Sequence, residues 1–188
     1  SYHDMYYMNF SGDPHIKEMR KSPEVKAAKE AIRKEHIHPE RLMKTLFANT
    51  DYLKWKVDAG ELMTSLFDVA SNMQSHDTGL ELYSLFTKEE CYDLWQLSNR
   101  GWYISFGPSP LTKGEMPSVE ANLLENILNT ADTCVVRKDS YATLRFGHES
   151  CLLPLACLLE LDDCGYQTDD LDKLDAIWRN YKIFPMAG

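Results

Sequence analysis

YATLRFGH (residues 141–148) and CLLPLACLL (residues 151–159) are the two adjacent runs that decide which fold the sequence predicts. The first run is short, contains β-branched and aromatic residues, and has turn residues on either side, which is typical of a strand. The second run is apolar all round, which is typical of a buried helix. The sequence therefore predicts a strand, a tight turn and a buried helix. Only residues 5–10 and 181–184 offer further candidate strands, so the expected sheet is small and incomplete.

Upstream of residue 138 the sequence predicts mainly helices. Capping residues, prolines at first helical positions and apolar residues at helical spacing mark their starts and their buried faces. The predicted helices run from Pro23 to about His36, from Pro39 to Phe47, from Asp58 or Gly60 to Met73, from Thr87 toward Gly107, and onward from near Ser118. In the last of these we expect a buried face formed by Leu123, Leu124, Ile127, Leu128 and Ala131.

These patterns together predict the α/β class, with a mostly helical cap inserted beside part of an α/β core that has a small, incomplete sheet. The length of 188 residues is typical of one domain, with room for an inserted subdomain. We expect a core-linked strand segment at residues 1–15, a helical cap subdomain at 16–138 and a C-terminal α/β core segment at 139–188.

Charge and cysteine usage exclude several classes of protein. The chain has 20 Lys and Arg against 29 Asp and Glu, a net charge of −9, which argues against a nucleic-acid binder that works through bulk charge. No apolar run is long enough for a membrane span, and the first residues do not resemble a signal peptide, so we expect a soluble chain without a leader. Five cysteines without a Cys-x-x-Cys pair suggest neither a zinc ribbon nor a thioredoxin-type site. In an oxidising compartment, one disulfide bond among them is an alternative to five free thiols.

The candidate chemistry follows the predicted strand. In α/β sheets, ligands prefer the crevice beyond the carboxyl end of a strand, where helix N-termini present free N–H groups. Gly147, His148 and Glu149 occupy that position. His148 can donate to an anion, and Glu149 can carry a proton to a leaving group. The alternative interpretation of the same residues is a structural turn.

The run from Leu144 to Ser150, with the apolar helix that follows, resembles the proton-donor segment of the histidine acid phosphatases, and most of all their multiple inositol polyphosphate phosphatase (phytase-like) group. The similarity extends to the stretches Leu85–Glu90, Gly107–Thr112 and Phe184–Ala187, and so covers most of the chain. This resemblance implies that His148 contacts phosphate and that Glu149 is the proton donor. It also implies an inositol polyphosphate such as phytate as substrate, a phosphohistidine intermediate, no cofactor, and a periplasmic or secreted protein.

One family motif is absent from the sequence. The family's nucleophilic histidine lies in an Arg-His-Gly segment near the N-terminus, and none of the six histidines here follows an arginine. Without that group the phosphohistidine cannot form. We therefore expect that these residues are a piece of a longer protein, that the missing N-terminal part of the same protein is their partner, and that this chain alone is inactive.

Two further clusters and one rival function complete the expectations. His36, His38 and the pair His76-Asp77 resemble metal ligands, but they fall at predicted helix ends, where a histidine complements the helix dipole. We expect no metal. A basic stretch containing Lys26, Lys29 and Arg33 is either a solvated helix face or a site that attracts a polyanionic substrate. The rival to the enzyme is a noncatalytic helical binding module in which Gly147–Ser150 is only a turn.

Overall fold

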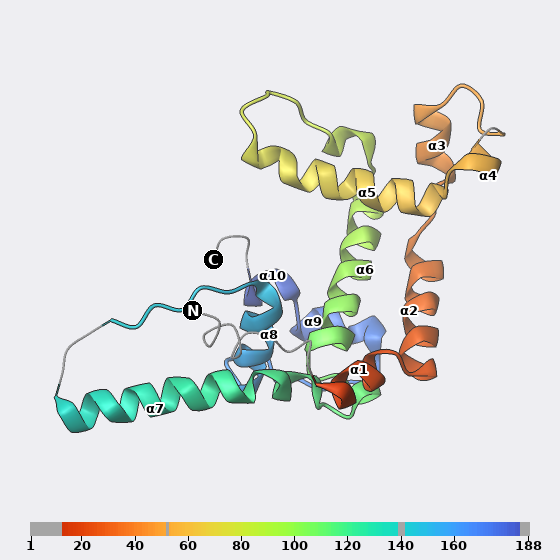
Figure 1. Cartoon of the computed structure of the whole chain (residues 1–188). Helices are drawn as coiled ribbons and strands as arrows, with labels where there is room; N and C mark the ends of the chain where they lie inside the picture. The colour runs from red at the N-terminus through yellow and green to blue at the C-terminus, as the bar shows by residue number, and fades with distance from the viewer. Residues whose placement is uncertain (1–12, 52, 139–141, 185–188) are drawn as a thin grey trace. The chain divides into compact units, whose positions relative to one another are not determined.

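A computed structural model describes residues 13–51, 53–138 and 142–184 (Figure 1). All of the regular secondary structure in these ranges is helical. The α-helices are α1 (Pro14–Arg20), α2 (Pro23–His36), α3 (Glu40–Leu46), α4 (Leu53–Lys56), α5 (Ala59–Asn72), α6 (Lys88–Phe106), α7 (Ala121–Arg137), α8 (Glu149–Leu158), α9 (Leu174–Ile177) and α10 (Asn180–Ile183). Short 3₁₀ helices are η3 (Met73–Ser75), η4 (Tyr83–Leu85), η5 (Pro110–Thr112), η6 (Met116–Glu120) and η7 (Leu171–Lys173).

The predicted α/β class is wrong for the described residues, which form an all-helical structure without a strand. Residues 142–147 are extended, but no backbone in the described part of the chain pairs with them. The second candidate strand, 181–184, is mostly helical, because the Phe184 N–H donates to the Asn180 carbonyl at 3.0 Å. A strand needs a partner to satisfy its backbone, so β-type residues alone do not make a sheet. The third candidate, residues 5–10, lies outside the described residues.

The chain divides into two compact units. The first contains residues 1–28 and 99–188, and the second contains residues 29–98. Each boundary falls inside a helix, within α2 and within α6. The predicted division at residues 15 and 138 stays a prediction.

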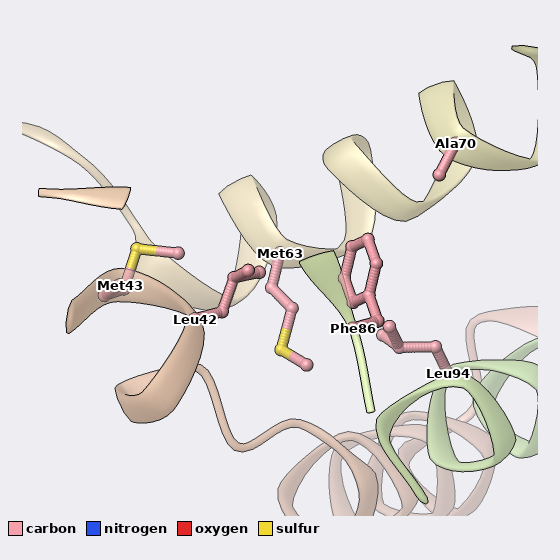
Figure 2. Close-up of a cluster of buried hydrophobic side chains, with 6 residues drawn as sticks. All are labelled: Leu42, Met43, Met63, Ala70, Phe86 and Leu94. Atoms are coloured by element: carbon pink, nitrogen blue, oxygen red, sulfur yellow. The ribbon is translucent and has the colours of Figure 1, made fainter. Parts of the chain in front are cut away.

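The second unit is built around an apolar core from α3, α5, α6 and the segment between α5 and α6 (Figure 2). The ring of Phe67 meets the ring of Phe86 edge-on, with centroids 5.6 Å apart. A capping box begins α6, as the sequence predicts: the Thr87 N–H donates to Glu90 Oε2 at 2.9 Å, and the Glu90 N–H donates to Thr87 Oγ1 at 3.2 Å. The side chains of the core are Leu42, Met43, Met63, Ala70, Phe86 and Leu94.

The first unit has two buried junctions. At one of them, η6 packs against α8, and Met116 and Leu153 are completely buried. At the other, the ring of Tyr103 on α6 meets the ring of Trp178 edge-on, with centroids 5.2 Å apart, and both side chains are buried. The predicted helix at 151–159 is confirmed as α8, and its apolar character follows from this burial.

The predicted buried face of α7 is largely wrong. Leu123 is buried, but Leu128 is 56% exposed and Ala131 is also exposed. Leu124 and Ile127 are only partly buried. Helical spacing of apolar residues marks one face of a helix, but whether that face is covered depends on which elements reach it. Here η6 and α8 contact α7, and its C-terminal half, including Val135 and Val136, stays exposed.

Candidate active site

The candidate site lies where the extended residues 142–147 lead into α8 (Figure 1). His148 is the N-cap residue, with extended backbone angles (φ −104°, ψ 168°), and its carbonyl accepts hydrogen bonds from Cys151 N at 2.9 Å and Leu152 N at 3.1 Å. Glu149 is the first helical residue. Placing a carboxylate in the first turn is favourable, because it faces the partial positive charge of the helix N-terminus. The sequence correctly predicts a helix directly after this pair, but the strand that it predicts before the pair is absent from the described residues.

The side chains of His148 and Glu149 are both exposed to solvent. The His148 ring makes no capping hydrogen bond to the helix. The first N–H groups of an α-helix have no partner within the helix, so an anion that approaches α8 would meet backbone donors and the helix dipole together. The pair is therefore chemically available: one ring nitrogen that can contact an anion and one carboxyl that can exchange a proton with a bound molecule.

Arg145 holds the extended segment onto α7. Its guanidinium donates to Asn126 Oδ1 from Nη2 at 2.8 Å and from Nε at 3.2 Å, and Nη2 also donates to Thr130 Oγ1 at 2.8 Å. Leu144 and Phe146 stand on either side of Arg145 in the sequence. Both are highly exposed. Sequence reasoning gave Arg145 no role, because its partners lie 15 and 19 residues earlier in the chain.

A buried carboxyl group lies beneath the first turn of α8. Glu120, the last residue of η6, is completely buried, and no nitrogen or hydroxyl donor in the described residues reaches either of its carboxylate oxygens. Its polar neighbour is the thiol of Cys151, a weak hydrogen-bond donor. Burial raises the pKa of Glu120 to about 7, and burial together with the nearby Glu120 raises the pKa of Cys151 to about 11. The sequence contains no motif that marks Glu120.

The basic residues predicted to bind substrate are divided between the two units. Lys26 is exposed on α2 in the first unit and has no described hydrogen bond or ion pair to either residue. Lys29 and Arg33 belong to the second unit. There the Arg33 guanidinium pairs with the carboxylate of Glu61 at 2.8 Å. This ion pair gives Arg33 a role within its own unit.

The other histidines occupy separate positions. The Nδ1 atom of His36 lies 3.0 Å from Asp93 Oδ1, and the Nε2 atom of His38 lies 2.8 Å from the carbonyl oxygen of Glu35, at the C-terminal end of α2. His76 directly follows η3. No group of three or more His, Cys, Asp or Glu side chains within the described residues is arranged to hold a metal ion.

Two broader findings complete the description of the chain. None of the helices in its described part has both the length and the apolarity that crossing a membrane requires. No protein-family model matches the sequence, and a comparison with curated proteins finds no match. The resemblance of residues 144–150 to the histidine acid phosphatases stays a prediction.

Proposed function

We propose that this chain supplies the proton-donor half of an active site that hydrolyses phosphomonoesters. The observation that carries the proposal is the position of His148 and Glu149, adjacent, exposed and at the N-terminus of a buried helix. The resemblance of the run Leu144–Ser150 to the histidine acid phosphatases supports the same chemistry. His148 then hydrogen-bonds a phosphoryl oxygen, and Glu149 protonates the alcohol oxygen as the P–O bond breaks.

A histidine nucleophile completes the reaction. It attacks phosphorus to form a phosphohistidine, and water then releases inorganic phosphate. Because no histidine here lies in an Arg-His-Gly motif, we assign the nucleophile to another part of the same protein, and we expect this chain alone to be inactive. Residues 142–147 make no backbone pairing within the described part of the chain, and the roles proposed for His148 and Glu149 need none. The proposal therefore does not depend on a sheet within this chain.

The proposed substrate class is inositol polyphosphates. The N-terminus of α8 favours an anion, but a net charge of −9 opposes a polyanion in general, so cationic groups must be concentrated near the bound phosphates. Lys26, an exposed cation of the basic stretch, shares a unit with His148. A periplasmic or secreted location belongs to the same proposal, on the resemblance alone.

A noncatalytic helical binding module is the second candidate, and one observation favours it. Leu144 and Phe146 are 74% and 81% exposed, and Val135 and Val136 on α7 are similarly exposed. Neighbouring exposed apolar side chains are typical of surfaces that bind another protein. In this interpretation Gly147–Ser150 is only the turn that begins α8. The two candidates differ in whether Glu149 has a role in turnover.

Phosphate release by the full-length protein that contains this chain tests the proposal. Phytate has a poor alcohol leaving group that needs a proton, whereas the phenolate leaving group of p-nitrophenyl phosphate needs little protonation. Glu149→Gln should therefore lower kcat for phytate by about 10²–10⁴-fold and lower kcat for p-nitrophenyl phosphate much less. The matched control is Glu18→Gln, which changes an exposed glutamate on α1 in the same unit and should leave both rates unchanged.

Three outcomes would contradict the proposal. If Glu149→Gln is as active as the parent, Glu149 is not the acid. If both substrates lose activity equally, the substitution acts on binding or folding and not on leaving-group protonation. An inactive parent protein would favour the binding module.

A further inference from the structure

Two of the five cysteines lie together at the C-terminal end of α8. Cys157 is in the last turn of the helix, and its thiol donates to the carbonyl oxygen of Cys164, with Sγ and O 3.1 Å apart. The backbone at Gly165 lies close to the end of α8: a side-chain carbon built at Gly165 would lie 3.9 Å from the Cys157 carbonyl oxygen. The Cys157 thiol therefore lies against the backbone of the residue that carries the second thiol.

The turn between the two cysteines is held in one conformation. Glu160 and Asp162 both have left-handed backbone angles, with φ of 49° and 45°, which non-glycine residues rarely adopt. Backbone hydrogen bonds fix this turn, from Glu160 N to Cys157 O at 3.1 Å and from Cys164 N to Leu161 O at 2.9 Å. The Nε1 atom of Trp178 also donates to the Cys164 carbonyl oxygen at 3.2 Å. Cys164 is thus positioned against Cys157 by the fold.

Other pairings within this unit are less favourable. Cys151 and Cys157 are six residues apart on the same helix, so their Cα atoms are separated by about 9 Å, too far for a disulfide. Cys151 lies beside Glu120 instead. Cys134 lies in the C-terminal half of α7, and Cys91 belongs to the other unit.

We propose that Cys157 and Cys164 are a redox-active pair that forms an intramolecular disulfide under oxidising conditions. With glutathione disulfide as the oxidant, one cysteine thiolate attacks the glutathione disulfide and releases one glutathione. The second thiolate then attacks the mixed disulfide, closing the Cys157–Cys164 bond and releasing the second glutathione. Two thiols are oxidised, one disulfide is reduced, and the two cysteine protons end on the two glutathione molecules.

Burial controls when this reaction takes place. It raises the pKa of Cys157 to about 12 and also raises the pKa of Cys164, and both side chains are almost completely buried. Because the thiolate is the nucleophile, the folded reduced protein should react slowly with glutathione disulfide. A chain that refolds in the presence of the oxidant, while the thiols are exposed, should form the bridge much faster.

The experiment is to refold the chain in a glutathione buffer of oxidising poise, quench with acid, unfold, alkylate the thiols and determine the mass. Of the five cysteines, three should be alkylated, against all five after full reduction. Cleavage after glutamate separates the two positions at Glu160, so the peptides 150–160 and 161–188 should remain linked until they are reduced. The variant Cys151→Ser should retain this linkage and thereby assign it to Cys157.

Cys157→Ser and Cys164→Ser should each abolish the linked peptide pair and leave four alkylated thiols. Five alkylated cysteines in the parent chain at oxidising poise, or a linked pair that persists in either variant, would overturn the proposal. The measurement on the parent chain decides the question even if a serine variant folds poorly.

Discussion

Two buried polar side chains in the first unit, Asn99 and Glu120, have opposite surroundings. The amide of Asn99 is completely buried, accepts a hydrogen bond from Asn180 N at 2.7 Å and donates to the Trp178 carbonyl oxygen at 3.3 Å. The carboxyl group of Glu120 is equally buried, but within the described residues its polar neighbour is the Cys151 thiol. The Asn99 amide is hydrogen-bonded to backbone groups distant in the chain. The Glu120 carboxyl group is removed from water and has a weak thiol donor beside it.

The difference shows that burial alone does not decide what a polar group does for stability. A neutral amide with two backbone partners stabilises the fold at any pH, because neither partner titrates. A poorly solvated carboxyl group favours its neutral form, so its contribution to stability changes with pH. The Asn99 junction should therefore act as a fixed connection between α6 and the segment 178–180, whereas the Glu120 junction between η6 and α8 should respond to pH.

Replacing the amide gives the largest expected effect. Asn99→Ala removes the hydrogen bonds that the amide makes with the Trp178 carbonyl and the Asn180 N–H at a buried junction, and each such loss costs about 1–3 kcal/mol. We expect a loss of about 4 kcal/mol in the free energy of unfolding, measured by urea denaturation followed by helical circular dichroism. Asn129→Ala, at an exposed position on α7, is the matched control and should change stability little. A loss for Asn99→Ala no larger than that of the control would contradict the interpretation.

The pH dependence of stability gives the next largest effect. The pKa of Glu120 is about 7 in the folded protein, because burial disfavours the charged form, against an ordinary value of 4.5. Between these values the folded state binds more protons than the unfolded state, so stability is highest at low pH and falls as pH rises toward 7. The contribution of Glu120 to the free energy of unfolding should therefore fall by about 3 kcal/mol as the pH rises from about 4.5 to about 7.

Glu120→Gln, a neutral substitution of similar shape, isolates this contribution. The stability of the parent minus that of the variant should decrease from about pH 5 to about pH 8, because the other titrating groups cancel in the difference. Glu125→Gln, the same substitution at an exposed position on α7, provides the matched control. A difference for Glu120→Gln that is constant with pH would show that this carboxyl group is not desolvated in the folded protein.

The smallest expected effect concerns the hydroxyl group of Tyr103, at the same junction as Asn99. This oxygen accepts from Thr168 N at 2.9 Å and lies 3.2 Å from the Thr168 carbonyl oxygen and 3.3 Å from that of Tyr166. Tyr103→Phe keeps the ring against Trp178 and should cost about 1–2 kcal/mol in urea denaturation. Tyr83→Phe removes an exposed hydroxyl group and should be close to neutral. If the two substitutions lower the free energy of unfolding equally, the hydroxyl group of Tyr103 does not stabilise this junction.

Six helices could be predicted from the sequence to within a few residues: α2, α3, α5, α6, α7 and α8. The short helices α1, α4, α9 and α10 were not predicted, and α10 lies where a strand was expected. Pro23, Asp58 and the Thr87–Glu90 capping box begin α2, α5 and α6 as predicted, because start signals act on the N–H groups of the first turn and need no distant partner. The apolar run at 151–159 was also correctly predicted as a helix. The sheet was predicted wrongly, because pairing between strands is not a local property and residues 142–147 have no partner in the described chain.

The candidate site was predictable in position but not in its surroundings. The position of Glu149 at the start of α8 follows from the local sequence. Three features of its surroundings do not follow from the local sequence, because each depends on where the chain folds back. They are the hydrogen bonds between Arg145 and α7, the burial of Glu120 beneath α8 and the contact between Cys157 and Cys164. The roles of His148 and Glu149 in turnover stay predictions.

The sequence by itself determined the helices α2, α3, α5, α6, α7 and α8 and the adjacency of His148 and Glu149, because propensity, capping and spacing act over a few residues. Tertiary structure alone decided which polar groups are satisfied and which side chains of α7 stay exposed. A hydrogen bond such as that from Asn180 to Asn99 joins residues 81 positions apart, and burial depends on which elements pack together. These long-range contacts make the Asn99 junction independent of pH and the Glu120 junction dependent on it, although both contain ordinary polar residues.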